Sequence, residues 1–158
     1  MGTINNAFNQ AAGAAAGAAL AIKHAKETEE TKMNTTDSTA IVARNQARAA
    51  NDEANAAGAE AAKPGGLYNQ LAIAEIKAEK ADKAYNKAVK RKNGSYRTRA
   101  QKFTELEAAN KAVDELNKKY QALENIKERA QEQRNYAAKA TKMAIEAKEK
   151  FEKHWGGK

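Results

Sequence analysis

Apolar residues recur along this chain at alternating steps of three and four positions, a spacing that places them on one face of an α-helix. The pattern covers four segments, at residues 4–31, 39–62, 67–92 and 98–154. In the second segment every repeated residue is alanine, at Ala43, Ala47, Ala50, Ala54, Ala57 and Ala61. The pattern therefore predicts an all-α fold of long helices that pack along heptad-like seams rich in alanine.

Polar and helix-breaking residues mark the boundaries between these segments. The stretch TKMNTTDST at residues 31–39 predicts a helix break, after which Asp37 or Ser38 could cap the following helix. The stretch KPGG at residues 63–66 predicts a second break. The chain is therefore divided into three parts, residues 1–31, 32–66 and 67–158.

The last two segments are predicted to form an antiparallel helical hairpin. Asn93-Gly94-Ser95 at its tip indicates a tight turn, in which Gly94 or Asn93 is able to take a positive φ. The seam of the fourth segment slips at Ile126, so a break within residues 126–136 is also compatible with the pattern.

Alanine dominates the composition and limits how much a single chain can bury. The chain has 158 residues, of which 38 are alanine and none is cysteine. A buried methyl group contributes less than about 1 kcal/mol, whereas ordering each residue costs about 1–2 kcal/mol. We therefore expect the helices to depend on neighbours, and the assembly to contain several copies of the chain.

The first 22 residues carry no charge and include a GxxxG pair. A secretory signal is disfavoured because no basic residue precedes the apolar run. A permanent transmembrane helix is disfavoured because most of the apolar residues are alanine. Close helix packing is the favoured interpretation, with membrane contact through residues 4–22 on release as an addition to it. The residues assigned to this surface are Ile4, Phe8, Gly13, Gly17, Leu20 and Ile22.

The net charge of +8 arises from one stretch, because residues 83–104 contain eight basic residues and no acidic one, whereas the remaining residues balance at 20 of each sign. The basic residues are Lys83, Lys87, Lys90, Arg91, Lys92, Arg97, Arg99 and Lys102. Such a patch favours DNA or an acidic protein surface as partner, although a solvated helix corner is the alternative. Tyr96 is a candidate for stacking on bases, whereas Tyr85 occupies a seam position.

Residues for catalysis are missing from the sequence. His24 and His154 lie 130 positions apart without metal-ligand spacing, and the only two serines, Ser38 and Ser95, fall in predicted turns or caps. No phosphate-binding glycine motif occurs. We therefore expect no enzymatic activity, no catalytic or metal-binding residue and no cofactor.

The run AFNQAAGAAAGAALAIKHAKETEE, followed by TAIVARNQARAANDEANAAGAEAA, resembles the smaller internal virion (ejection) proteins of short-tailed bacteriophages. It is also similar, more loosely, to the DNA pilot proteins of small single-stranded DNA phages. The resemblance covers residues 1–62, is compositional and transfers no functional residue. It implies a homo-oligomer among other virion proteins of the portal or tail lumen, located in the virion interior. Ejection with the genome and help for DNA crossing the host envelope would follow.

Three alternatives remain open from the sequence. One is a head–tail structural adaptor of a virion without a membrane role. Another is a protective protein of the late-embryogenesis-abundant kind, which the stretch AAKATKMAIEAKEKFEK resembles in composition. The third is a nucleoid-type DNA-binding protein, which the charge balance outside the basic stretch disfavours.

Overall fold

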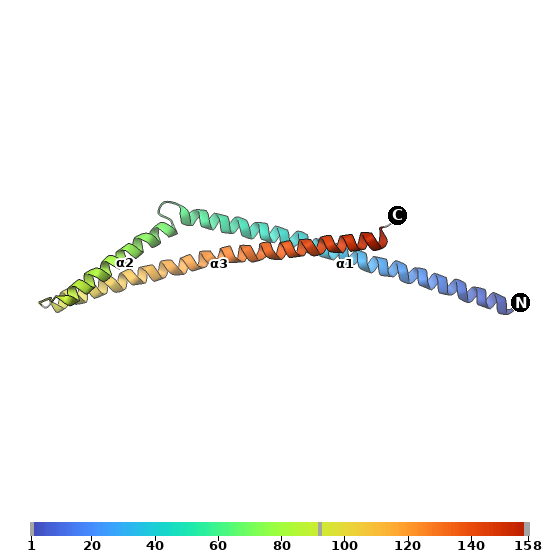
Figure 1. Cartoon of the computed structure of the whole chain (residues 1–158), viewed down its shortest axis with the longest axis horizontal. Helices are drawn as coiled ribbons and strands as arrows, with labels where there is room; N and C mark the ends of the chain where they lie inside the picture. Colours follow the sequence, from blue (N-terminus) through green and yellow to red (C-terminus); the bar gives the residue numbers. More distant parts are fainter. Residues whose placement is uncertain (1, 92, 157–158) are drawn as a thin grey trace. The chain divides into compact units, whose positions relative to one another are not determined.

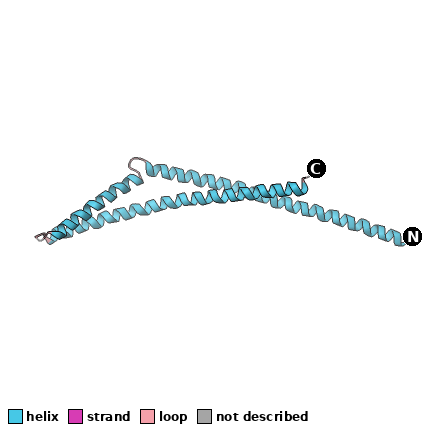
Figure 2. Ribbon diagram, viewed as in Figure 1, coloured by secondary structure: helices cyan, strands magenta, loops and turns pink. Residues whose placement is uncertain are grey.

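The computed structural model describes residues 2–91 and 93–156, which form three helices (Figure 1). Helix α1 comprises Gly2–Ala62, α2 comprises Leu67–Lys90 and α3 comprises Tyr96–Trp155. Within these described ranges the chain contains no strand (Figure 2). The prediction of an all-α fold is therefore confirmed.

Helix α1 continues through residues 31–39, so the predicted break there is wrong. Five threonine hydroxyls donate to the carbonyl oxygen four residues earlier at 2.8–2.9 Å, those of Thr28, Thr31, Thr35, Thr36 and Thr39. These bonds satisfy the hydroxyls inside the helix, so they do not compete for the N–H groups of the backbone. Because residues 18–57 also lack glycine and proline, nothing in this stretch interrupts the helix.

The turn between α1 and α2 matches the prediction and requires its glycines. Gly65 has a φ of 76°, a conformation that other residues rarely adopt. A Cβ atom on Gly66 would lie 2.6 Å from the carbonyl oxygen of Glu60. The amide of Gln70 secures the start of α2, because its side-chain Nε2 donates to the Gly65 oxygen at 2.8 Å.

The hairpin tip between α2 and α3 forms the predicted turn, without a positive φ at Gly94. The turn is closed by a bond from the Gly94 N–H to the Arg91 oxygen at 3.3 Å. Helix α3 begins two residues earlier than expected and runs without a break through residues 126–136. Residues 96–155 contain no glycine or proline, which explains this continuity.

The chain divides into two compact units, and the boundary falls within α1 and α3. Unit 1 comprises residues 1–47 and 133–158, and unit 2 comprises residues 48–132. In unit 1, α1 and α3 run antiparallel, and their methyl groups form a cluster of Ala40, Ala43, Ala47, Ala137, Ala140 and Ala144. Near the end of α3, Trp155 Nε1 donates to Glu29 Oε2 at 2.7 Å.

Unit 2 contains the hairpin of α2 and α3 together with the last part of α1. Two ring pairs set its antiparallel register: Tyr68 with Tyr120, at 6.1 Å between centroids, and Tyr85 with Phe103, at 5.6 Å. The buried apolar residues of this unit are Ala54, Ala61, Ala74, Leu123 and Ala130. Leu123 is the single buried side chain larger than alanine among the described residues.

The two serines of the chain provide a test of the continuous α1 helix. Ser38 lies inside α1, whereas Ser95 caps α3, since its Oγ accepts the N–H of Thr98 at 3.2 Å. Ser38→Ala should stabilise the protein by up to about 0.5 kcal/mol, because alanine is the better helix former. Ser95→Ala should destabilise it by about 0.5–2 kcal/mol. Urea denaturation measures both changes, and a loss of stability in Ser38→Ala would contradict a helix at residues 31–39.

The alanine cluster of unit 1 should not tolerate larger side chains. Ala43 is 1% exposed, so Ala43→Leu should destabilise the protein by about 1–3 kcal/mol through overpacking. Ala49→Leu is the matched control, because Ala49 is an exposed residue of the same helix. Thermal denaturation followed by circular dichroism compares the two, and equal melting temperatures would contradict the close approach of α1 and α3.

Candidate assembly surface and candidate nucleic-acid interface

The uncharged start of α1 has no partner within the part of the chain that the structure describes. Every residue from 3 to 32 is exposed, and the bulky residues Ile4, Phe8, Leu20 and Ile22 are 58–76% exposed. A Cβ atom on Gly13 or Gly17 would meet nothing within 4 Å. Figure 1 shows this part of α1 continuing beyond the C-terminal end of α3. The structure thus brings none of these predicted packing residues against another helix.

Helical periodicity divides the predicted packing residues of α1 between two faces, and the continuity of α1 decides which face is in phase with Ala40. Ile4, Ile22 and Ala40 are spaced by 18 residues, which is about five full turns at 3.6 residues per turn, so they share one face. Phe8 lies one turn after Ile4 on this face, which we call the seam face, because Ala40 packs against α3 on the same side. The seam face therefore continues from the packed part of unit 1 into the unpaired part of α1.

The glycines point the other way. Gly13 lies 27 residues, or about seven and a half turns, before Ala40, and so occupies the opposite side of the helix. Gly17 and Leu20 lie within about 40° of Gly13 at 100° per residue. We call these three residues the glycine face. The start of α1 therefore presents two apolar faces on opposite sides, rather than one continuous site.

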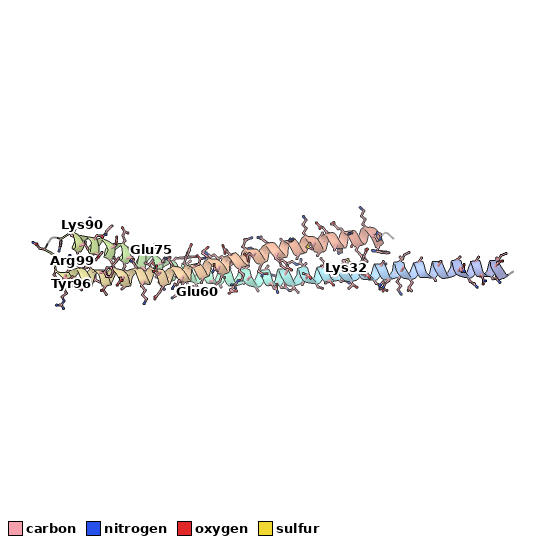
Figure 3. The ribbon with its side chains drawn as sticks, turned by 90° about the horizontal axis from the view of Figure 1, so that it is seen from below. Lys32, Glu60, Glu75, Lys90, Tyr96 and Arg99 are labelled. Carbon is pink, nitrogen blue, oxygen red and sulfur yellow. The ribbon has the colours of Figure 1, made fainter. Side chains whose placement is uncertain are left out.

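The basic residues gather at the tip of the hairpin in unit 2. Lys83, Lys87 and Lys90 lie on α2, Arg91 follows it, and Arg97, Arg99 and Lys102 lie on α3. Lys92 lies outside the described residues. Figure 3 shows Lys90, Tyr96 and Arg99 at the same end of the hairpin. The predicted stretch is thus brought together on both arms of one turn.

Carboxylates that flank the basic stretch pair with two of its lysines. Lys83 Nζ lies 2.9 Å from Glu79 Oε1, and Lys102 Nζ lies 3.1 Å from Glu105 Oε2. The hydrogen bond and the charge of Glu79 raise the pKa of Lys83, and the same contact lowers the pKa of Glu79. Among the described residues no ion pair involves the other basic residues of the tip, which are Lys87, Lys90, Arg91, Arg97 and Arg99.

Two hollows lie on the tip and share Arg91. The first has a volume of about 420 Å³ and is lined by Ala88, Arg91, Asn93, Gly94, Ser95, Thr98 and Arg99. The second has a volume of about 570 Å³ and is lined by Lys83, Asn86, Lys87, Lys90 and Arg91. The guanidinium of Arg99 is held beside the first hollow, because its Nη2 donates to the Gly94 oxygen at 3.1 Å. The two hollows therefore adjoin at Arg91, with the first between the arms of the hairpin and the second along α2.

The two tyrosines near the tip have different environments. Tyr85 packs on Phe103 within the hairpin, at 5.6 Å between ring centroids, as its seam position predicts. Tyr96 opens α3 and is 83% exposed, the highest exposure among the large apolar residues of the described chain. The ring of Tyr96 is therefore available to a ligand of the tip.

A polar cluster that the sequence analysis did not identify ties the two arms of the hairpin together. Lys127 Nζ donates to Tyr68 Oη at 3.0 Å and lies 3.2 Å from Glu124 Oε1. The bond to Tyr68 and then the bond to Glu124 raise the pKa of Lys127. The i,i+3 spacing of Glu124 and Lys127 is visible in the sequence, but Tyr68 is 59 residues away and is found only from the fold.

The remaining chemistry of the described residues is sparse. They contain no group of three His, Cys, Asp or Glu side chains that could hold a metal ion. His24 is exposed on α1, and the ring of His154 lies edge-on to Trp155 at 4.6 Å. None of the helices that the structure describes has both the length and the apolar character needed to cross a membrane.

Comparisons with known proteins give no relative of the chain. No protein-family model matches it, and neither the curated proteins nor the solved structures include one that is significantly similar.

The pair of Glu79 and Lys83 should make a small, pH-dependent contribution to stability. Because folding lowers the pKa of Glu79 below 4.5, this contribution is present above pH 4.5 and is lost as the pH falls through the folded-state value. Glu79→Gln should therefore lower the melting temperature slightly at pH 7 and have a smaller effect at pH 2.5. Thermal denaturation at both pH values measures the difference, and an equal effect at both would contradict the ion pair.

Proposed function

We propose that this protein is a structural bacteriophage protein that packs as a helical oligomer in the capsid, portal or tail lumen. On infection it leaves with the genome and helps DNA cross the host envelope. The observation that carries the proposal is the uncharged start of α1, which is exposed on all sides and presents two opposite apolar faces. The resemblance of residues 1–62 to ejection proteins supports the location.

The large exposed surface of a single chain supports association with other copies. Its accessible surface is 12,224 Å², whereas a compact monomer of 17.1 kDa exposes about 7,800 Å². An isolated helix in water is only marginally stable, and each glycine within it costs about 1 kcal/mol relative to alanine. Gly13 and Gly17 therefore weaken α1 unless a neighbour packs against them.

Two opposite faces favour more than two copies. A symmetric dimer uses the same patch on both partners, whereas two different patches join copies head to tail into rings, or into open filaments where the rotation does not close. The seam face of one copy could thus meet the glycine face of the next. Charge does not oppose this arrangement, because parallel copies would place identical uncharged side chains side by side over residues 1–22.

The same stretch supports contact with a membrane after release. Ile4, Phe8, Leu20 and Ile22 are exposed, and no charged group within residues 1–22 would need to leave water. Small residues at Gly13 and Gly17 permit close helix contact in lipid as well as in water. We therefore assign these residues to assembly first and to the envelope second.

Association of the chain tests the assembly. Phe8→Glu with Ile22→Glu disrupts the seam face, and Gly13→Leu with Gly17→Leu disrupts the glycine face. Each pair should weaken association at least tenfold, because a buried side chain of this size contributes about 1.5–3 kcal/mol. Analytical ultracentrifugation over a concentration series measures the change. Because each head-to-tail contact uses the seam face of one copy and the glycine face of the next, disrupting either face should leave monomers. Residual dimers would contradict the head-to-tail arrangement and indicate contacts between like faces.

Ile76→Glu is the matched control, because Ile76 is 53% exposed on α2, much as Ile22 is 58% exposed on α1. It should leave association unchanged. A wild-type chain that stays monomeric and coil-like by circular dichroism would contradict the assembly and favour the protective-protein alternative.

The proposed contact of residues 4–22 with the host membrane is tested separately. Vesicles of bacterial lipid that enclose a dye should leak on addition of the wild-type protein, and a chain lacking residues 4–22 should cause no leakage. Oligomers that cause no leakage would contradict the membrane role and favour the head–tail adaptor. Mass spectrometry of purified particles would contradict the virion location if the chain were absent.

A further inference from the structure

We propose that the hairpin tip binds single-stranded DNA, with its cations on the phosphates and Tyr96 stacked on a base. The inference concerns unit 2 and does not rest on the assembly proposed for α1. It depends on three observations, which are the cations of the tip that form no ion pair within the described chain, the two hollows that four of them line, and the exposed ring of Tyr96, which opens α3 outside both hollows.

The placement of the arginines on α3 is not explained by the stability of the helix. Cations near a helix C-terminus are favourable, which accounts for Lys87 and Lys90 in the last turn of α2. The first turn of α3 is a helix N-terminus, where acidic residues are favoured, yet it contains Arg97 and Arg99 and no acidic residue. An anion at this end would be attracted by both arginines and by the helix dipole.

The two hollows of the tip are lined by groups that bind phosphate. Arg91 belongs to both hollows, and Arg99 lines the first together with the hydroxyl-bearing residues Ser95 and Thr98. Arginine presents a planar fork of donors that matches phosphate oxygens, and hydroxyl groups commonly add contacts to the DNA backbone. From Lys83 to Arg91 the basic residues extend about 12 Å along α2, a length that allows contact with more than one phosphate of a strand.

Tyr96 favours unpaired bases over the alternatives. Its ring is 83% exposed at the first residue of α3, next to the turn that carries the cations. Aromatic rings beside a basic groove stack on the bases of single strands, whereas the bases of a duplex are stacked on one another. An acidic protein surface would satisfy the cations but would not require an exposed ring at this position.

Fluorescence anisotropy with a labelled 20-nucleotide oligo(dT) tests the site. The full chain should bind, and the affinity should fall as the salt concentration rises. Replacement of Lys87, Lys90, Arg91 and Arg97 by glutamine should reduce the slope of log K against log[salt] by about 3, at about 0.7 per phosphate contact. None of these four residues forms an ion pair within the described chain, so the hairpin should keep its helix content by circular dichroism.

The matched control removes the same charge from the other part of α3 in unit 2. Lys111, Lys118, Lys119 and Arg129 are exposed there, and their replacement by glutamine gives a chain of equal net charge. This variant should retain the wild-type slope. An equal loss of slope in both variants would overturn the proposal, because binding would then follow net charge alone.

The stacking role of the Tyr96 ring is tested separately. Tyr96→Ala should weaken binding of oligo(dT) by roughly 5- to 150-fold, whereas Tyr96→Phe should retain it, because stacking needs the ring but not the hydroxyl. Binding of a 20-base-pair duplex should be equal in the wild type and Tyr96→Ala. If Tyr96→Ala binds oligo(dT) as the wild type does, the stacking role is overturned.

Polyglutamate separates DNA from an acidic protein partner. At equal charge concentration it should displace oligo(dT) poorly from the wild-type chain. Displacement as efficient as that by unlabelled oligo(dT) would overturn the proposal and indicate that the tip binds acidic protein. The association experiments on α1 use other residues, so a failure of DNA binding leaves the proposed assembly standing.

Discussion

Close approach of helix backbones over methyl side chains is the interaction on which both units depend. Ten of the eleven buried apolar residues among those described are alanine, and Leu123 is the exception. Each buried methyl contributes only about 0.8 kcal/mol, so the packing gains little from any single residue. The packing gains instead from length, because α1 and α3 each continue for about 60 residues without interruption. Stability is therefore distributed along the seams, and no central core is available to replace a lost contact.

This distribution of contacts along the helices leaves two kinds of apolar surface, one buried and one exposed. Where a second helix is present, as at Ala40 and Ala140, the methyl groups are buried and the register is fixed. Where it is absent, as at Ile4 and Phe8, the same helix continues with larger apolar residues and without charge. The basic tip is a third kind of surface, in which charge rather than apolar area is concentrated. Each surface lies on a different part of the chain, so assembly and anion binding need not compete.

The sequence predicts the helices and the buried positions well, because both follow from local rules. Seam positions such as Ala43 and Ala137 are buried, and the KPGG stretch forms the predicted turn. The prediction of a helix break at residues 31–39 fails, because a threonine hydroxyl can either cap a helix or donate to a carbonyl oxygen inside one. Composition does not distinguish these two roles. The sequence also groups the packing residues of α1 as one site. Gly13 and Ile22 are nine residues apart, so they already lie on opposite sides of the helix predicted at residues 4–31, and the continuity of α1 adds only that the side of Ile22 is in phase with Ala40.

The threonine-rich stretch at residues 31–39 therefore sets the rotation of the unpaired part of α1 relative to its packed part. It joins the packed part of α1 to the unpaired part without a break, and the spacing of 18 residues between Ile22 and Ala40 keeps the two in angular phase. One residue more or fewer within residues 31–39 would turn everything before it by about 100° relative to α3. Substitutions there would leave the phase unchanged, whereas insertions or deletions would redirect both apolar faces at once. The length of this stretch is thus constrained more tightly than its composition.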